Sequence, residues 1–384
     1  MHKPVLIGSE IYRVSSFGGA HPLSIARVSS VMDMVRALDL SDTDQFQSAP
    51  RAKPALLQQF HDVAYIKALQ RIERDQYATE QDQKKFNIGT LSNPIFPHMF
   101  KRPATSVGCS LLGADCVAAG VKAYALGGGL HHGMAGFANG FCFLNDLVFA
   151  IRRLQALGLG RVAYVDLDAH HPDGVEAAFP DEENLLIIST HEENRWPFLG
   201  SLKDNKPLKN LNIPLPAGCQ DSEFNLVLDD LILPVLTRFA PEVIVVQGGA
   251  DALLYDPLSR LALSNNALWR ALRALLECSD RVLLTGGGGY NPWTVARLWT
   301  GFWAILNDHP IPKQLTPRAR GILGSLSWNR KRNLPSYLFD TLYDPPTEGP
   351  IRPEIKDLIQ RLKSLHAIKK VGIQSMPDLS KGCG

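Results

Sequence analysis

Short apolar runs, many of them β-branched, alternate along this chain with longer stretches in which apolar residues recur at helical spacing. The apolar runs predict β-strands, which span Val5–Gly8, Lys122–Leu126, Arg161–Asp166, Leu185–Ser189, Val243–Gln247 and Arg281–Thr285. The helical spacing predicts α-helices, which span Ser24–Leu38, Pro54–Arg71, Asp146–Leu157, Ser222–Phe239, Asn265–Cys278 and Trp293–Leu306. Apolar strands separated by helices form parallel sheets that are buried on both faces. We therefore expect a three-layer α/β/α fold around a mainly parallel sheet.

The last clear strand–helix unit ends near Pro312, which divides the chain. Residues 1–312 are expected to form the main domain, and residues 313–384 an appendage with a Pro-rich loop and one amphipathic helix. The apolar stripe of that helix consists of Ile355, Leu358, Ile359, Leu362 and Leu365, and it predicts that the helix packs on the main domain. Near the beginning of the chain, Ser24 is a candidate N-cap, and Thr79–Pro103 is interpreted as a long loop.

The composition narrows the class of protein. With 45% hydrophobic and 20% charged residues, the chain can build a large core, and global disorder is excluded. No apolar run approaches the roughly 18 residues that a membrane-spanning helix needs. The first residues are typical of a β-strand and not of a signal peptide, so we expect a cytoplasmic protein. The six cysteines include no C-x-x-C pair and are expected to be free core residues.

Charge is distributed unevenly, although the net charge is only +2. Lys and Arg outnumber Asp and Glu after Pro312, and the reverse holds before it. A basic segment can attract nucleic acid, but only Trp328 lies near a basic run, which is too few aromatic residues for a stacking platform. We therefore expect a solvated extension and predict neither nucleic acid nor a membrane as a partner. The charge distribution is also compatible with a homo-oligomer.

The segment that follows the strand Arg161–Asp166 concentrates charged and metal-binding residue types. Three carboxylates and two imidazoles within eight residues would repel and desolvate one another unless a cation were present. Alternate residues of an extended backbone share a face, so Asp168 and His170 point the same way. Their oxygen and nitrogen atoms suit zinc. Asp166 lies on the same face as Asp168 and is a candidate to support it. The alternative interpretation, a solvated acidic loop, would not need two adjacent histidines.

Glycine-rich clusters follow three other strands. His131 and His132 come after three glycines, and spare carboxylates are available to orient their rings. Asp251 follows two glycines and offers a third metal ligand, and three protein ligands with an open position are typical of catalytic zinc. Tyr290 follows four glycines and is a phenol able to donate to an oxyanion. All these clusters follow strands, at the edge where open α/β sheets build their sites.

Taken in order, the four clusters resemble the histone-deacetylase-like superfamily, which has the arginase-type fold. Three further segments are similar to its signatures, namely Thr90–Pro97, Asn139–Asp146 and Asp256–Leu261. The resemblance covers roughly Val5 to Pro312, and the motif sequences are most similar to those of bacterial acetoin-utilisation-type deacetylases. It implies hydrolysis of an N-acetyl or other short-acyl amide, of lysine or of a small amine, at the carboxyl-terminal edge of the strands.

The resemblance also implies roles for individual residues. The ligands of zinc, or of ferrous iron in vivo, would be Asp168, His170 and Asp251. The tandem acid/base pair would be His131 and His132, backed by Asp166 and Asp173 respectively. The carbonyl of the acyl group would be polarised by Tyr290, and the acyl channel would be lined by Gly140 and Phe141. A structural potassium ion would lie on Asp166, the backbone of Asp168 and His170, Ser189 and the backbone of Thr190.

Two positions depart from the family pattern. Pro172 stands where a glycine usually follows the tandem histidines, and proline fixes φ and removes a backbone donor. Ser92 occupies a rim position where the family often has an aspartate that holds a peptide backbone. A hydroxyl accepts such hydrogen bonds more weakly than a carboxylate does. We therefore expect a small acylated amine, or an exposed flexible acyl-lysine, as the preferred substrate.

Three alternatives come from the same residues. An acetylpolyamine amidohydrolase fits the same site. A ureohydrolase with two manganese ions is disfavoured, because the second ion needs further carboxylates and Tyr290 would have no role. A catalytically silent acyl-lysine binder is disfavoured because the ligands, both histidines and Tyr290 are all present.

Overall fold

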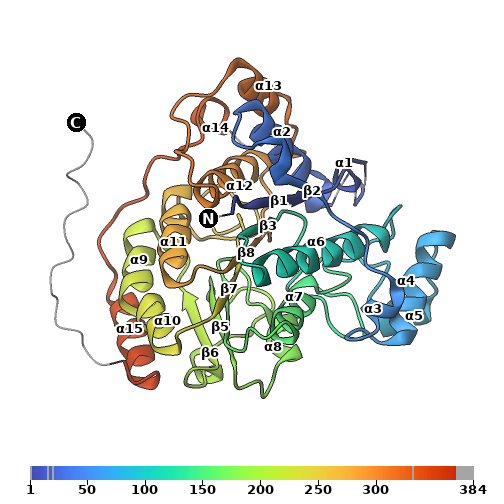
Figure 1. Ribbon diagram of the computed structural model, residues 1–384, viewed down its shortest axis with the longest axis horizontal. Helices are drawn as coiled ribbons and strands as arrows, with labels where there is room; N and C mark the ends of the chain where they lie inside the picture. The colour runs from blue at the N-terminus through green and yellow to red at the C-terminus, as the bar shows by residue number, and fades with distance from the viewer. Residues whose placement is uncertain (1, 15–16, 20, 331–332, 369–384) are drawn as a thin grey trace.

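The computed structural model describes residues 2–14, 17–19, 21–330 and 333–368. Within them, eight strands form one sheet in the order β2-β1-β3-β8-β7-β4-β5-β6 (Figure 1). Every pair of neighbouring strands is parallel. The strands are β1 Val5–Gly8, β2 Phe46–Ser48, β3 Ala123–Ala125, β4 Val162–Asp166, β5 Leu185–Glu192, β6 Asn210–Leu215, β7 Val243–Gln247 and β8 Val282–Thr285. The parallel sheet confirms the predicted fold class.

The two edge strands are the ones that the hydrophobic pattern did not predict. Strand β2 has only three residues and is partly exposed. Strand β6 has the sequence NLNIPL, in which two asparagines and a proline interrupt the apolar run. Proline within a sheet is confined largely to edges and strand ends, and an edge strand needs less apolar character than a central one. The six central predictions agree with the observed strands to within a few residues.

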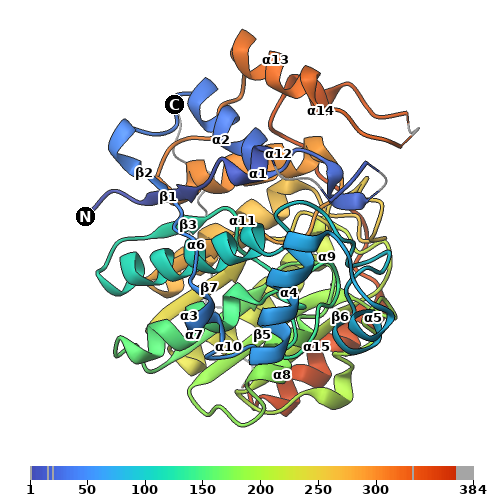
Figure 2. The same ribbon diagram turned by 90° about the vertical axis from the view of Figure 1, so that its right-hand side faces the viewer.

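Helices cover both faces of the sheet, as Figures 1 and 2 show. Alternate strand residues enter two separate cores: Tyr124 and Val165 face one, and Ala123 and Tyr164 face the other. The first core is covered by α2 Val28–Ala37, α9 Asp221–Val227, α10 Leu233–Phe239, α11 Asn265–Cys278 and α12 Pro292–Leu306. A π-helical turn, η4 Leu228–Ile232, joins α9 to α10. The second core is covered by α6 Lys101–Ala118, α7 Asp146–Ala156 and α8 Asp173–Ala178.

Several helix boundaries differ from the predicted ones. Ser24 is not an N-cap, because it lies in the 3-10 turn η1 Pro22–Ser24 and α2 begins only at Val28. The predicted helix Pro54–Arg71 is divided into α3 Pro54–Leu57 and α4 Val63–Asp75. Helix α6 was not predicted, since its buried face consists largely of small residues such as Gly, Ala, Ser and Cys, which give little apolar periodicity.

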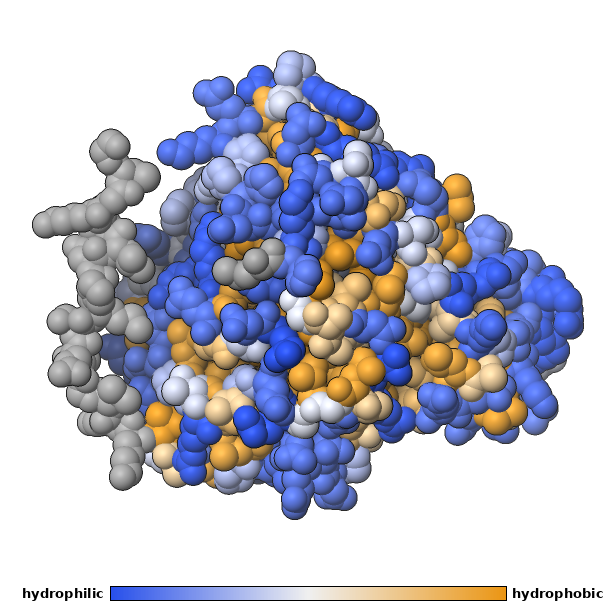
Figure 3. Space-filling view, viewed as in Figure 1, coloured by the Kyte–Doolittle hydropathy of each residue, from blue (hydrophilic) through white to orange (hydrophobic). Residues whose placement is uncertain are grey.

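The predicted loop Thr79–Pro103 contains a helix, α5 Glu80–Phe86. Thr79 caps it through a side chain that accepts the backbone N–H of Asp82. Helices α4 and α5 lie at the right-hand edge of Figure 1, and the space-filling view of Figure 3 shows that this edge is mainly hydrophilic on the side that it presents. Beneath them a third apolar cluster includes Tyr65, Phe143 and Tyr290.

The segment after Pro312 packs against the rest of the protein. Helices α13 Pro317–Ser325 and α14 Tyr337–Asp340 lie against α2 and α12, and α15 Pro353–Leu365 lies against α9 and η4. Four of the five predicted stripe residues of α15 are buried, but Leu365 is 40% exposed. The proposed division into residues 1–312 and 313–384 stays a prediction. None of the described helices has the length and apolar character needed to cross a bilayer.

Candidate metal centre and active site

The four residue clusters follow four strands that are neighbours in the sheet. Strand β3 leads to His131 and His132, β8 to Tyr290, β7 to Asp251, and β4 to Asp168. These strands occupy consecutive positions in the order β3-β8-β7-β4, and they are parallel. Their carboxyl ends therefore meet at one edge, so segments that are far apart in the sequence converge on one place.

Asp168, His170 and Asp251 form a compact, buried group of donor atoms. Nδ1 of His170 lies 3.1 Å from Oδ1 of Asp168 and 3.0 Å from Oδ2 of Asp251. Zinc binds nitrogen and oxygen at about 2.0–2.2 Å, so ligand atoms that share one ion lie roughly 3 to 3.5 Å apart. The spacing and the chemistry of this donor set fit a divalent metal ion.

Neighbouring backbone and side-chain groups hold the two carboxylates in place. Oδ2 of Asp168 accepts from Nε2 of Gln247 at 2.9 Å and from the backbone N–H of Gly288 at 2.7 Å. Oδ1 of Asp251 accepts from the backbone N–H of Ala169 at 3.0 Å. A Cβ at Gly288 would lie 2.1 Å from Oδ2 of Asp251. The glycine run after β8 is therefore required by the close approach of its backbone to the donor set.

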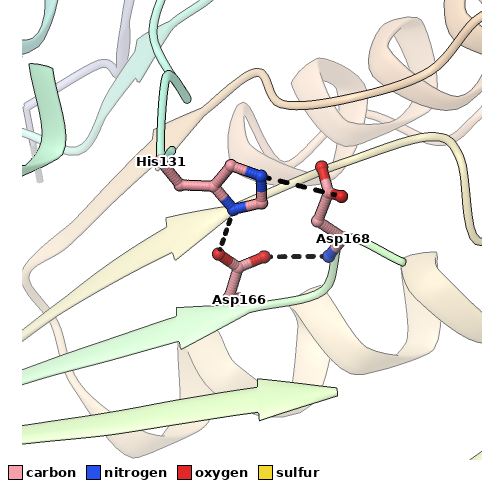
Figure 4. A group of neighbouring side chains, drawn as sticks. All are labelled: His131, Asp166 and Asp168. Atoms are coloured by element: carbon pink, nitrogen blue, oxygen red, sulfur yellow. Dashed lines mark hydrogen bonds and ion pairs between the residues drawn. The ribbon is translucent and has the colours of Figure 1, made fainter. Parts of the chain in front are cut away.

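His131 lies beside this group and is paired with a buried carboxylate (Figure 4). Its Nδ1 is 2.8 Å from Oδ2 of Asp166, and its Nε2 is 3.8 Å from Oδ1 of Asp168. Oδ2 of Asp166 also accepts the hydroxyl of Tyr164, and Oδ1 accepts the backbone N–H of Asp168. Burial opposes protonation of His131, but the charges of Asp166 and Asp168 outweigh it and raise the pKa of His131 to about 9.

His132 is paired with a second carboxylate and has a different protonation equilibrium. Its Nδ1 is 2.6 Å from Oδ1 of Asp173, whose Oδ2 accepts from Nδ2 of Asn139 at 2.8 Å. Burial, followed by the charge of the neighbouring His131, lowers the pKa of His132 to about 4. At neutral pH the ring of His132 is therefore neutral. Because Nδ1 faces the carboxylate and carries the proton, Nε2 is left as a proton acceptor.

Tyr290 faces the same space from the loop after β8. Its backbone N–H donates to Oδ2 of Asp256 at 2.7 Å, and its ring meets that of Phe141 edge-on with the ring centroids 5.7 Å apart. Burial, with the negative charges of Asp251 and Asp168, raises the pKa of the phenol well above its ordinary value. The hydroxyl therefore stays protonated and available as a donor.

A cavity of about 340 Å³ leads from the surface to these groups. Its lining consists of Asn87, Ser92, His132, Asn139, Gly140, Phe141, His170, Arg195, Trp196, Leu258 and Tyr290. Gly140 has φ +52°, and a Cβ there would lie 2.4 Å from Cη2 of Trp196 and 2.5 Å from Cδ2 of His132. The channel is therefore open only because this position is glycine. Ser92 lies exposed in the same lining.

Sequence reasoning did not identify Trp196 and Arg195, which form one wall of the channel. The Trp196 ring meets that of His132 edge-on with the ring centroids 4.7 Å apart. Both residues follow β5 closely, after the run His191-Glu192-Glu193, and no glycine cluster lies beside them. The available signal was a Trp-Pro pair shortly after an apolar strand, which by itself has many explanations.

Of the groups expected at the potassium site, Ser189 lies beside Asp166 in the sheet. Strand register pairs Asp166 with Ser189. Oγ of Thr190 donates to the backbone oxygen of Asp166 at 3.2 Å, and Oγ of Ser189 lies 2.9 Å from Nδ1 of His191. The assignment of a potassium ion to these residues stays a prediction.

Together the fold and the donor set define a class of protein, a parallel α/β enzyme with a sheet-edge site that is suited to a metal ion. Known proteins similar to this chain identify the family within that class. The model of the histone deacetylase domain matches residues 21–306. The chain therefore belongs to the histone deacetylase family, and it is a hydrolase of the deacetylase type that acts on amide bonds. Membership also implies a metal cofactor and an acetylated substrate.

Individual relatives support this assignment. The acetoin utilization protein AcuC of Bacillus subtilis (strain 168) is 33% identical over 332 residues, which cover 82% of this chain and 86% of that protein. Histone deacetylase 9 of Arabidopsis thaliana is 32% identical over 314 residues, which cover 78% and 72%. Two crystal structures, an HDAC homolog complexed with SAHA and an HDAC homolog from Aquifex aeolicus, each have a TM-score of 0.90 and 35% identity. Each match covers 94% of this chain and 100% of theirs.

Proposed function

We propose that this deacetylase is zinc-dependent and hydrolyses an N-acetyl or other short-acyl amide of lysine or of a small amine. The observation that carries the proposal is the convergence of the donor set Asp168, His170 and Asp251, two carboxylate–histidine pairs and the protonated Tyr290 beside a single channel. The ion would be held by Asp168, His170 and Asp251, which leaves an open position on the channel side. Bound zinc lowers the pKa of water and polarises a carbonyl.

The two histidines divide the proton transfers. Nε2 of the neutral His132 accepts a proton from the water whose oxygen attacks the acyl carbon. When the carbon–nitrogen bond breaks, His132 returns that proton to the leaving amine, so the products are the free amine and the carboxylic acid. His131 lies 3.9 Å from His132 between ring centroids and carries a positive charge. It therefore contributes mainly electrostatic stabilisation.

Tyr290 supports the reaction from the opposite wall. Its hydroxyl donates to the substrate carbonyl oxygen as negative charge develops there, and Asp256 and Phe141 hold the residue in position. A structural potassium ion on Asp166, Ser189 and the nearby backbone would stabilise the loop that carries Asp168 and His170.

The alternatives are less well supported. A ureohydrolase would use a second metal ion, for which His131, Asp166 and Asp168 form the candidate group. Both oxygens of Asp166, however, already accept hydrogen bonds, from the hydroxyl of Tyr164 and from the backbone N–H of Asp168. Tyr290 would also lack a role in it. An acetylpolyamine amidohydrolase uses the same chemistry and differs only in the amine.

Substitution of the metal ligands tests the proposal. We expect the enzyme to contain about one zinc ion and to hydrolyse a fluorogenic acetyl-lysine peptide. Asp168→Ala and Asp251→Ala should each lose both zinc and activity, because each removes one of three ligands. Asp229→Ala, which removes a surface carboxylate paired with Arg270, is the matched control and should retain both. Full zinc occupancy in either ligand variant, measured by elemental analysis, would contradict the assignment.

A further inference from the structure

Arg195 brings a permanent positive charge to the wall of the channel. Among the described residues that line the cavity, it is the one with a side chain that is charged at every physiological pH. It directly precedes Trp196, whose ring contacts His132, and its backbone oxygen accepts the N–H of Phe198 at 2.7 Å. The guanidinium therefore belongs to the same tight turn that forms the channel wall.

Glu192 orients this charge. Its carboxylate accepts hydrogen bonds from Nε and Nη2 of Arg195 at 2.9 and 2.8 Å. It also accepts one from the backbone N–H of Arg260 at 2.7 Å. The carboxylate is buried, with 5% exposure, whereas the Arg195 side chain is 25% exposed. Arg195 is thus the more accessible member of the pair, and it is the member that lines the cavity. A guanidinium has five N–H donors, so three are not used by Glu192.

We propose that Arg195 selects the substrate by the charge at the end remote from the amide, and that it favours an acyl amine that carries a carboxylate over one that carries an ammonium group. This inference rests on the proposed deacetylase function. A guanidinium binds a carboxylate through paired hydrogen bonds and repels a cation. The preferred substrate class is therefore an N-acylated amino acid or a flexible acyl-lysine beside an acidic group, and acetylpolyamines are disfavoured.

A matched pair of small substrates measures this preference. The compounds 6-acetamidohexanoate and N-acetylcadaverine have the same acetamide and five methylene groups but opposite terminal charges, and 5-acetamidopentan-1-ol is the neutral reference. We expect kcat/KM to be on the order of tenfold higher for the anion than for the cation, since attraction of one and repulsion of the other add. The ratio should fall with added salt.

Three variants separate a specificity role from a merely structural one. Arg195→Gln removes the cationic partner of the Glu192 carboxylate and should bring the anion-to-cation ratio of kcat/KM below one. Glu192→Gln removes the anionic partner of the guanidinium and should raise that ratio. Loss of loop structure would lower kcat/KM for both substrates and leave the ratio unchanged. Arg260→Gln is the control, because only its backbone contacts Glu192, and it should keep the wild-type ratio.

The outcomes distinguish this inference from the proposed function. If the wild-type enzyme hydrolyses neither the small amides nor the acetyl-lysine peptide, the proposed function fails and the inference fails with it. If it hydrolyses the peptide but shows no preference between the charged amides, or cleaves neither of them, the deacetylase function stands and the role of Arg195 is overturned. An equal shift of the ratio in Arg260→Gln would also overturn it.

Discussion

At the scale of single residues, Tyr290 combines a structural requirement with a chemical one. The glycines before it allow the backbone to approach Asp168 and Asp251, and the same turn presents the phenol to the channel. A phenylalanine would keep the ring contact with Phe141 and remove only the hydroxyl. Tyr290 is therefore the residue at which chemistry and binding are most easily separated.

We expect Tyr290→Phe to lower turnover of the acetyl-lysine peptide by about two orders of magnitude or more, because it deletes a donor to the oxyanion. Zinc content and the binding of a hydroxamate inhibitor should be retained. Tyr343→Phe is a matched control, because its hydroxyl contacts the backbone oxygen of Ile311 away from the channel. Unchanged turnover in Tyr290→Phe would mean that another group polarises the carbonyl.

At the scale of elements, the connection between β3 and α7, residues 126–145, shapes the channel. Gly140 and Phe141 both have positive φ, and Oδ1 of the buried Asn93 accepts the backbone N–H of Phe141 at 3.1 Å. The ring of His21 meets Phe141 with the ring centroids 4.5 Å apart. Residues from two earlier segments thus fix the wall that faces Tyr290.

Gly140→Ala tests the importance of this segment. The added methyl would contact Trp196 and His132, so we expect kcat/KM to fall at least about tenfold, as small misplacements in a site commonly cost that much or more. Gly158→Ala is the control: it also has positive φ, +91°, but its Cβ would meet nothing within 4 Å. It should lose only about 1 kcal/mol of stability, measured by thermal unfolding, and keep its activity. Equal activity of the two variants would show that the channel tolerates the methyl group.

The elements also show where hydrophobic patterns have limits. Central strands such as β4 and β7, and helix α11, were predicted closely because they are buried and strongly periodic. Helix α6 was missed although it has 18 residues, because packing of small residues against the sheet leaves no apolar stripe to detect. Its existence depends on close contact with α7 and β3, which local sequence does not encode.

At the scale of the whole molecule, the shape of the channel mouth determines which substrates can reach the site. Ser92 lies exposed in the channel lining. A serine hydroxyl holds a peptide backbone less tightly than a carboxylate would. We therefore expect Ser92 to form only weak hydrogen bonds with the backbone of an extended peptide.

We expect small acylated amines, or acyl-lysine in flexible peptides, to be hydrolysed with a higher kcat/KM than acetyl-lysine in a folded protein. A competition panel of acetylated small amines, an acetyl-histone peptide and the folded acetylated histone would measure this. The free peptide is the control for the folded protein, since both carry the same acetyl-lysine. A folded histone processed much faster than every small amine would contradict the expectation and would indicate that Ser92 or a neighbour grips peptide.

The sequence by itself determined the α/β class and the segments that carry the site. Both depend on local information: burial on two faces makes a strand continuously apolar, and each group of candidate site residues follows directly after one such strand. It also indicated Asp168 and His170 by their donor types, and Asp251 and Tyr290 by the glycines that precede them.

Only the tertiary structure decided which groups meet. The order β3-β8-β7-β4 brings His131, Tyr290, Asp251 and Asp168 together, and it depends on pairing between strands that are far apart in the sequence. The channel wall formed by Trp196 and the charge of Arg195 were likewise decided by folding, because the loop after β5 reaches the site only when β5 lies next to β4. A single aromatic and a single arginine carry no local signal of their position, and their importance arises from the side chains that they face.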